Sequence, residues 1–355
     1  MSSLFTPAAA GNLPLRNRIV MAPMTRSRAV ENATPNALHA EYYQQRASAG
    51  LIISEGVATS ADGLGYARTP SIHTPEQIAA WRTVTDAVHR KGGRIAVQLM
   101  HVGRIAHPAN QPAGGRVVAP TAIAAQGSMW TDASGMQPFP IPQALTLEGI
   151  KEVIADYAQA VRNAREAGFD TVELHAANGY LPNQFLSTNS NQRTDEYGGN
   201  PVNRARFVLE AYDAMAEAWE PGRIGIRLSP AGTFNDIDDS ESSAIYPLLA
   251  AELNKRNAAW IHIVKVDSPR YTRWDAIRAN FQGTLIVNKG LTQEVATELI
   301  DSGQADLVAF GVPFISNPDL PERFQNGWPL AQPDQSTFYT SGAQGFTTYP
   351  SFANA

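Results

Sequence analysis

The sequence of 355 residues contains no cysteine. A chain without thiols forms no disulfide and offers no thiolate to zinc or to an iron–sulfur cluster. It also has no cysteine nucleophile. Disulfide-stabilised scaffolds, cysteine-ligated metal proteins and thiol enzymes are therefore excluded.

The sequence also lacks an excess of basic residues and long apolar runs. Lys and Arg number 28 against 33 Asp and Glu, which gives a net charge of -5 and argues against nucleic acid or an anionic membrane as the main partner. Residues 1–18 have no basic segment followed by an apolar stretch, as a signal peptide would have. Apolar runs such as residues 50–56 fall far short of the roughly 20 residues of a membrane-spanning helix. We therefore expect a cytoplasmic protein without membrane association.

The motif G-x-G-x-x-G is absent as well, which disfavours a doubly wound dinucleotide-binding fold, and neither a P-loop nor H-E-x-x-H occurs. What the sequence has instead is a series of short β-branched runs, each followed by an amphipathic stretch. Their near-continuous apolar character suits parallel strands buried on both faces. The runs are residues 18–24, 50–56, 94–101, 169–175, 223–230, 260–265, 284–289 and 307–311. Eight such units predict a single α/β domain over residues 1–355, a (β/α)8 TIM barrel.

Helix-start signals lie between these runs. Thr146 precedes a 3.6-residue apolar repeat over residues 147–168, which favours a capped amphipathic helix. Thr74 is followed by Pro75 at the first helical position. Thr292 precedes a further helical stretch in the same way. The alternation of strand and helix signals supports the barrel.

Two loops and the tail are also informative. Residues 102–145 and 176–201 form long loops, which in a barrel lie over the active-site face. The tail from about residue 331 is polar but carries aromatic residues, which a disordered segment would have few of. These residues are Phe338, Tyr339, Phe346, Tyr349 and Phe352. We therefore expect the tail to pack back on the barrel.

Barrel enzymes carry their functional residues at the carboxyl ends of the strands. Here these ends are rich in hydrogen-bonding groups and hold one acidic residue, Glu55. A carboxylate-bound metal and hydrolysis by paired acids are therefore disfavoured, and we expect no metal. The amide, guanidinium and backbone groups at these ends instead suit a planar heterocycle with a phosphate tail.

The most informative cluster is His175-x-x-Asn178-x-Tyr180, which follows the fourth predicted strand. His175 and Asn178 could donate hydrogen bonds to one carbonyl oxygen and stabilise developing enolate charge. The phenol of Tyr180 is suited to delivering a proton to a carbanion-like carbon. The alternative for the cluster by itself is a polar loop whose histidine is buried against backbone.

Six segments carry a resemblance to a known family. They are PMTR (23–26), AVQLMHVGR (96–104), HAANGYLPNQFLS (175–187), NQRTDEYGG (191–199), GIRLSP (225–230) and AFGVPFISNPDL (309–320). In this order, and over nearly the whole chain from about residue 4 to about residue 352, the sequence resembles the Old Yellow Enzyme family of flavin ene-reductases.

The resemblance implies non-covalently bound FMN that is reduced by NAD(P)H. Thr25 matches the residue whose hydroxyl faces the flavin C4 carbonyl, Gln98 the residue that pairs with the pyrimidine edge, and Arg227 the cation near N1 and the C2 carbonyl. Gly290 and Gly311 match glycines whose backbone N–H groups bind the phosphate. The full set of implied FMN-binding residues is Ala22, Pro23, Met24, Thr25, Gly56, Gln98, His175, Arg227, Lys289, Gly290, Phe310, Gly311 and Val312.

The resemblance also implies that small activated alkenes are the substrates, namely α,β-unsaturated carbonyls, maleimides and nitro compounds. His175, Asn178 and Tyr180 match the catalytic residues of a ping-pong cycle. The implied substrate-binding residues are Tyr66, Met100, His175, Asn178, Tyr180 and Tyr349. Relatives include monomers and homodimers, and the sequence does not distinguish NADPH from NADH.

Three positions depart from the family pattern. Val312 stands where the family usually has an arginine that binds the FMN phosphate, and loss of that contact could cost about 1.5–3 kcal/mol. Lys289 stands where the family commonly has a small residue, and we hypothesise that it supplies the missing positive charge. Met100 replaces a common tryptophan, which is expected to widen the substrate pocket.

Two alternatives remain open at this point. One is another FMN-dependent barrel oxidoreductase, such as a hydroxy-acid oxidase or a dihydroorotate-type dehydrogenase, although the His175 cluster lacks the His–Arg pairing that such an oxidase needs. The other is a non-catalytic flavin-binding protein, which the change at Val312 would allow.

Overall fold

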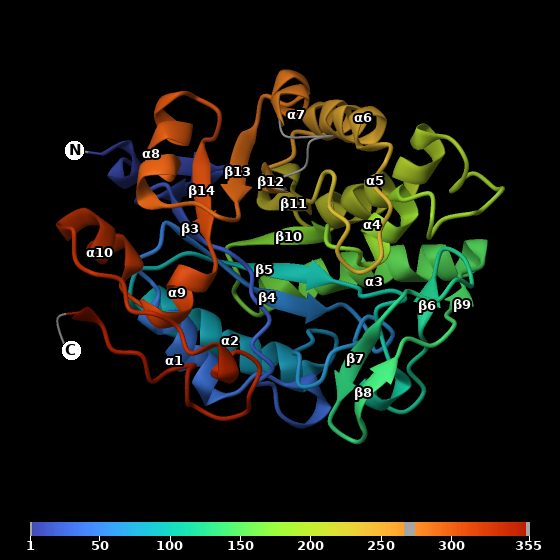
Figure 1. The fold of residues 1–355 in the computed structure, drawn as a ribbon, viewed down its shortest axis with the longest axis horizontal. Coiled ribbons are helices and arrows are strands. Elements are labelled where there is room, and N and C mark those ends of the chain that lie inside the picture. Colours follow the sequence, from blue (N-terminus) through green and yellow to red (C-terminus); the bar gives the residue numbers. More distant parts are fainter. Residues whose placement is uncertain (1, 266–273, 353–355) are drawn as a thin grey trace.

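Eight parallel strands close into a barrel in the computed structural model, which describes residues 2–265 and 274–352 (Figure 1). Each strand pairs with the next in sequence order among the eight, β10 pairs with β5, and β14 pairs with β3 to complete the ring. The strands are β3 (Ile19–Met21), β4 (Leu51–Ala58), β5 (Ile95–Met100), β10 (Thr171–Ala176), β11 (Ile224–Leu228), β12 (Trp260–Val264), β13 (Thr284–Asn288) and β14 (Leu307–Phe310). The predicted (β/α)8 barrel and its eight strands are confirmed.

The barrel interior is apolar at the end where the strands begin. Val20, Leu51 and Ile286 belong to one buried cluster in this region. The antiparallel hairpin of β1 (Ala8–Ala10) and β2 (Leu13–Leu15) contributes to the same cluster and closes this end of the barrel. Burial of apolar surface therefore stabilises one end and leaves the other end for polar groups.

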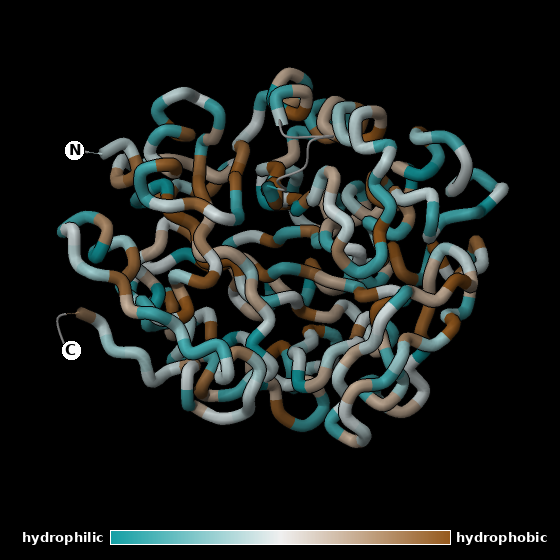
Figure 2. Tube along the Cα trace, in the orientation of Figure 1, coloured by the Kyte–Doolittle hydropathy of each residue, from teal (hydrophilic) through white to brown (hydrophobic). Residues whose placement is uncertain are grey.

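Helices surround the barrel, and a larger apolar cluster fills the space between them and the strands. Figure 2 shows hydrophobic segments along the central strands and more hydrophilic ones in the outer loops. The helices are α1 (Ala37–Gln45), α2 (Pro75–Arg90), α3 (Leu147–Glu166), α4 (Leu181–Leu186), α5 (Pro201–Ala218), α6 (Ser242–Lys255), α7 (Asp275–Asn280), α8 (Gln293–Asp301), α9 (Val312–Ser316) and α10 (Leu320–Asn326). Short 3-10 helices are η1 (Ser3–Phe5), η2 (Glu31–Ala33), η3 (Pro108–Asn110), η4 (Pro221–Arg223) and η5 (Gln335–Thr337).

The three predicted helix starts are confirmed. Thr74 caps α2 through a reciprocal pair of hydrogen bonds with Gln77. The hydroxyl of Thr146 accepts from a backbone N–H in the first turn of α3, and that of Thr292 does so for α8. Such caps satisfy backbone donors that have no partner within the helix.

The long loop between β5 and α3 carries strands of its own, and its hairpin of β7 and β8 projects beyond the barrel (Figure 1). Ile105 and Met129 of this loop pack in one apolar cluster with Met100 and Tyr180. The loop therefore covers strand ends of the barrel. Its strands are β6 (Val118–Ala119), β7 (Ser128–Thr131), β8 (Gly135–Pro138) and β9 (Gln143–Ala144).

Two buried arginines hold the carboxyl-terminal tail. Arg28 Nη2 donates to the carbonyl oxygens of Thr337 (2.8 Å) and Gln344 (2.9 Å). Arg26 Nη2 donates to the carbonyl oxygen of Gly345 (2.8 Å). Both arginines lie in the segment that leads from β3 to α1, so the tail is bound next to the barrel mouth.

An aromatic contact adds to this attachment. Phe346 is fully buried and stacks on Tyr42 of α1, with ring centroids 4.1 Å apart. The Arg28 guanidinium carbon lies 4.9 Å from the Phe346 ring centroid. Burial of this ring therefore couples the tail to the helix layer.

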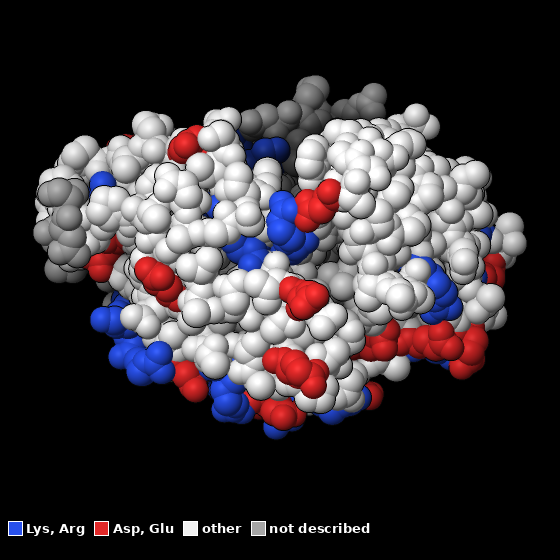
Figure 3. Space-filling model, turned by 90° about the horizontal axis from the view of Figure 1, so that it is seen from below, with Lys and Arg blue, Asp and Glu red and all other residues white. Residues whose placement is uncertain are grey.

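The surface carries charges of both signs. On the face drawn in Figure 3, basic groups lie near the middle and also along the edges, where acidic groups lie among them. Among the helices built from described residues, none is both long and apolar enough to cross a lipid bilayer.

We expect that Phe346→Ala lowers the free energy of unfolding by about 3–5 kcal/mol, the usual range for a buried phenylalanine. It should also expose the tail to proteases. Chemical denaturation and limited proteolysis measure the two effects. Phe352→Ala is the matched control, because Phe352 is 36% exposed and stacks on Trp328. Equal losses in the two variants would contradict a specific role for Phe346.

Candidate active site

The carboxyl ends of the strands form one mouth of the barrel. The β10–β11 register pairs His175 with Arg227, and the β11–β12 register pairs Arg227 with His262. Since residues paired in parallel register face the same side of a sheet, the three side chains point the same way, and all three are buried. Residues far apart in the sequence thus form one polar layer.

His175 is held as a neutral hydrogen-bond donor. Its Nδ1 accepts a hydrogen bond from the N–H of Ala177 at 3.3 Å, so Nδ1 carries no proton and the proton of the neutral ring is on Nε2. Burial, with the positive charge of Arg227, lowers the pKa of His175 to about 3. The imidazole therefore stays neutral at physiological pH.

Asn178 lies in the turn after β10 with a backbone φ of 56°, a conformation that asparagine adopts more readily than most residues. Its N–H donates to Ser229 Oγ (2.8 Å), and its carbonyl accepts from Asn235 Nδ2 (2.8 Å). Its side-chain amide forms no hydrogen bond with residues 2–265 or 274–352. The Asn178 backbone is therefore held in place, whereas its side-chain amide could bind a ligand.

Tyr180 lies against His175, with ring centroids 4.8 Å apart and the rings nearly perpendicular. Its hydroxyl donates to that of Tyr66 at 3.1 Å. Burial and the Tyr66 phenol raise the pKa of Tyr180 well above its usual value. The phenol therefore keeps its proton and can act as an acid. Tyr66, Met100 and Tyr180 belong to one apolar cluster, so three predicted substrate-binding residues lie together.

Polar groups on the two strands that pair with β10 flank His175. Arg227 Nη2 donates to Asn288 Oδ1 at 2.8 Å, whereas Arg227 Nε is buried without a partner among the described residues. Gln98 Nε2 donates to Glu173 Oε1 at 2.8 Å. Both predicted pyrimidine-edge residues are therefore fixed by neighbouring strands.

The ends of β13 and β14 combine unusual backbone with an exposed cation. Lys289 is exposed and has a φ of 90°, and Gly290 follows with a φ of 68°. A Cβ added at Gly290 would meet no atom within 4 Å, so this backbone borders open space. Pairing of Asn288 with Ala309 places Lys289 beside the end of β14, where Val312 is 49% exposed.

The segment after β3 forms another side of the mouth. Ala22 is buried in the barrel interior, Pro23 is buried, and Thr25 is half-buried. The sulfur of Met24 lies 3.4 Å from where a Cβ of Gly311 would stand. At Gly56 of β4, a Cβ would lie 2.6 Å from the sulfur of Met100. Glycine at position 56 thus leaves room for the Met100 side chain.

Two predicted site residues lie elsewhere. The Phe310 side chain points away from the mouth and packs on Phe324 of α10, with ring centroids 5.1 Å apart, because alternation along β14 turns it outward. The Tyr349 hydroxyl accepts from the Asp334 N–H at 2.8 Å, and its ring borders an outer cavity beside Gln45. The predicted roles of Phe310 and Tyr349 at the site stay predictions, and these contacts do not support them.

Sequence reasoning missed several residues at the mouth. Tyr339 lies close enough to Tyr66 and Tyr180 to affect their pKa values, although it was singled out only as a tail aromatic. Asn235 contacts both phenols from the β11–α6 loop. Asn288 had a detectable signal, because it precedes Lys289 at a strand end. No local pattern marks Asn235.

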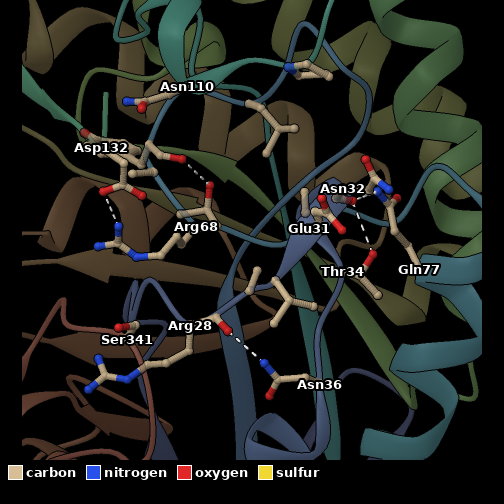
Figure 4. Close-up of a pocket in the computed structure, with 18 of the residues that line it drawn as sticks. Arg28, Glu31, Asn32, Thr34, Asn36, Arg68, Gln77, Asn110, Asp132 and Ser341 are labelled. Carbon is tan, nitrogen blue, oxygen red and sulfur yellow. Dashed lines mark hydrogen bonds and ion pairs between the residues drawn. The ribbon is translucent and has the colours of Figure 1, made fainter. Parts of the chain in front are cut away.

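A cavity of about 1100 Å³ lies beside the mouth and shares Tyr66 with it. Figure 4 shows polar side chains around it, with Arg68 directed towards Asp132 of the hairpin. Asn32 and Gln77 line another side (Figure 4). Tyr66 is the residue of the predicted site that lines this cavity.

The residues of the mouth fit FMN. Arg227 Nε is a buried donor without a partner, and a flavin N1–C2 carbonyl edge offers acceptors. The space at Gly290, next to the Lys289 cation, suits a phosphate. The neutral donor His175 and the protonated Tyr180 are suited to polarise a carbonyl and to protonate carbon.

Comparison with known proteins gives consistent matches over nearly the whole chain. A model of the NADH:flavin oxidoreductase / NADH oxidase family matches residues 3–331. A probable flavin mononucleotide-dependent alkene reductase of Leishmania infantum is 42% identical over 353 residues, 98% of this chain and 97% of that protein. 12-oxophytodienoate reductase 1 of Oryza sativa subsp. japonica is 41% identical over 357 residues, 98% of this chain and 92% of that protein.

Solved structures are similar over the same extent. Morphinone reductase in complex with tetrahydroNAD has a TM-score of 0.95 and 47% identity, and the match covers 99% of this chain and 98% of that one. The old yellow enzyme homologue of Zymomonas mobilis also has a TM-score of 0.95, with 40% identity, over 98% of this chain and 99% of that one.

The low pKa of His175 predicts a pH dependence of stability. Between its unfolded value of 6.5 and the folded value of about 3, the unfolded chain binds a proton that the folded chain does not. The contribution of His175 to the free energy of unfolding is therefore fully present above pH 6.5. It is lost as the pH falls, by up to about 1.4 kcal/mol per pH unit. Denaturation from pH 7 to 4 should show a shallower loss for His175→Asn than for the unaltered protein. Parallel curves would mean that the imidazole protonates in the folded state.

Proposed function

The chain belongs to the NADH:flavin oxidoreductase / NADH oxidase family, and from this premise we propose that it uses NAD(P)H to reduce activated C=C bonds with non-covalently bound FMN. Membership of the Old Yellow Enzyme family is confirmed, and the chain is an FMN-dependent oxidoreductase enzyme. The proposed substrates are α,β-unsaturated carbonyls, maleimides and nitro compounds. The names of an alkene reductase and a 12-oxophytodienoate reductase among its relatives support this substrate class.

One observation carries the proposal: a neutral imidazole donor and a protonated phenol lie face to edge, 4.8 Å between centroids, at the mouth of the barrel. The Nε2–H of His175 and the amide of Asn178 would bind the activating oxygen of the substrate. The His175 ring is oriented by the N–H of Ala177, and hydrogen bonds of the Asn178 backbone hold the turn that carries its amide. They can therefore stabilise negative charge on that oxygen without reorganisation.

Bound FMN supplies the redox chemistry, by accepting a hydride from NAD(P)H and giving it to the β-carbon of the alkene. Gln98 and Arg227 would hold its pyrimidine edge. The backbone at Gly290 and Gly311, with Lys289, would hold its phosphate. Further residues that would contact it are Ala22, Pro23, Met24, Thr25 and Gly56.

Tyr180 would provide the proton that the α-carbon needs. Its Oη–H is held by Tyr66 at 3.1 Å, and Tyr66 also lines the 1100 Å³ cavity. A proton lost from Tyr180 could thus be replaced from water through the hydroxyl of Tyr66. The saturated product gains one hydride and one proton, which balances the reaction.

The sequence has no separate dinucleotide-binding motif, so nicotinamide and alkene would use the same mouth in turn. This is a ping-pong order, in which NAD(P)⁺ leaves before the alkene enters. The cavity beside Tyr66 offers space for the remainder of the dinucleotide.

Anaerobic stopped-flow measurement of the two half-reactions tests the function. Flavin colour should bleach with NADPH or NADH and return with cyclohexenone. Tyr180→Phe should slow the return of colour by about 10²–10⁴-fold, the usual contribution of a positioned acid, while bleaching stays near normal.

Tyr66→Phe is the matched control for this measurement. This variant keeps the Tyr180 hydroxyl, so in a single turnover it should slow the return of flavin colour less than Tyr180→Phe does. Loss of bleaching in Tyr180→Phe would mean that its role is misassigned. Reduction by 2-hydroxy acids but not by NAD(P)H would favour a different FMN oxidoreductase, and a protein that takes up no FMN would favour a non-catalytic role.

Lys289→Ala should weaken FMN binding about ten- to hundredfold, because it removes the proposed cation at the phosphate. Alanine would share the unfavourable φ of 90°, so the change isolates the charge from backbone strain. Adding Val312→Arg to this variant should restore FMN affinity. Fluorescence titration of released FMN measures both. Normal FMN affinity in Lys289→Ala would exclude the compensation.

A further inference from the structure

A carboxylate lies inside the barrel directly below the mouth. Glu173 of β10 is fully buried, and the register of β10 with β5 pairs it with Gln98. Glu55 of β4 is also buried near the strand ends, but it contacts His39 of α1 and the N–H of Arg26. Burial of a carboxylate costs free energy unless its oxygens accept hydrogen bonds. The donors that contact Glu173 therefore indicate its role.

Donors from three side chains converge on Glu173. Its Oε1 accepts from Gln98 Nε2 at 2.8 Å. Its Oε2 accepts from Trp260 Nε1 at 2.9 Å and pairs with His262 Nδ1 at 2.9 Å. Indole nitrogen is a donor only, and a carboxylate that accepts several donors favours its ionised form.

The charge state follows from the same contacts. Burial opposes ionisation, yet the contacts with His262 and Trp260 and the charge of Arg227 hold the pKa of Glu173 below its usual range. A negative charge therefore lies under the cation that faces the proposed flavin edge. Burial lowers the pKa of Arg227, and Glu173 opposes that shift, so the two charges act on each other.

Glu173 also determines which way the Gln98 amide points. Because Gln98 Nε2 donates to Glu173, the amide oxygen is the acceptor that Gln98 retains for another partner. Without an anion beneath it, a glutamine amide could rotate and exchange its N and O positions. The orientation of Gln98 towards a ligand therefore depends on Glu173.

The neighbouring strand makes room for this arrangement. A Cβ at Gly225 of β11 would overlap the indole of Trp260, and Gly225 pairs with both Glu173 and Trp260 in register. Only glycine lets the indole cross β11 to reach the carboxylate. Glycine at position 225 therefore allows the hydrogen bond between Trp260 and Glu173.

We propose that Glu173 is a positioning residue that orients the Gln98 amide and offsets the charge of Arg227, and that it thereby sets both the affinity for FMN and its reduction potential. This inference rests on the proposed function, because it concerns the same flavin site. The carboxylate touches neither substrate nor flavin in this scheme. It acts through Gln98 and Arg227.

Two substitutions separate the two effects. Glu173→Gln removes the charge and brings an NH2 group against donors, so FMN affinity should fall about tenfold, the equivalent of one hydrogen bond. The unopposed Arg227 should then favour reduced over oxidised FMN by about tenfold, which is about 30 mV in midpoint potential for a two-electron couple. Glu173→Asp keeps the charge but shortens the reach to Gln98, so affinity should fall while the potential stays.

Trp260→Phe is the matched control, because it removes one donor to the same carboxylate but keeps its charge and its contact with Gln98. FMN affinity and potential should then change little. The measurements are FMN release from the holoenzyme and an anaerobic redox titration. A purely structural role would lower affinity without raising the potential.

These experiments distinguish failure of the inference about Glu173 from failure of the proposed function. An unaltered protein that binds no FMN would refute the function itself. If the unaltered protein binds FMN and folded Glu173→Gln matches it in affinity and potential, the inference is overturned. If Glu173→Gln does not fold, Glu173→Asp decides: unchanged FMN affinity overturns the inference, and reduced affinity at unchanged potential supports it.

Discussion

Strand β14 pairs in parallel with β3, through Phe310 and Met21 among others, and this pairing turns a sheet into a closed barrel. Closure leaves no free sheet edge and brings all eight carboxyl ends to one rim. His175, Arg227 and Gln98 come from three strands, and their distances depend on that closure. The polar mouth therefore follows from the same backbone hydrogen bonds that stabilise the fold.

The two ends of the barrel divide the energetic roles. At the closed end, apolar side chains around Leu51 and Ile286 stabilise the fold by burial. At the mouth, Glu173 and Arg227 bury charge, which costs several kcal/mol for each unpaired ion. Hydrogen bonds among strands offset most of this cost. Arg227 Nε and His262 Nε2 stay unpartnered among the described residues, as expected where polar groups are kept for a ligand.

Backbone strain is concentrated at the same rim. Asn178 has a φ of 56° and Lys289 a φ of 90°, and residues other than glycine in such regions cost of order 1–3 kcal/mol. For Asn178, a hydrogen bond from its N–H to Ser229 Oγ and one from Asn235 Nδ2 to its carbonyl oxygen hold the turn. Lys289 lies where glycine would be unstrained, which fits a side chain retained for its charge. The tail, attached through Arg26 and Arg28, closes this side of the rim.

The sequence alone determined the strands, the barrel, the helix caps and the cluster His175, Asn178 and Tyr180, because periodicity and capping are local properties of the chain. Only the tertiary structure decided that Tyr339 acts electrostatically on Tyr66 and Tyr180, that the Tyr349 hydroxyl contacts Asp334, and that the Phe310 ring packs on Phe324. It also decided that Glu173 lies beneath Gln98. Such facts depend on strand register and on how a distant segment packs, and neither is encoded in the spacing of neighbouring residues.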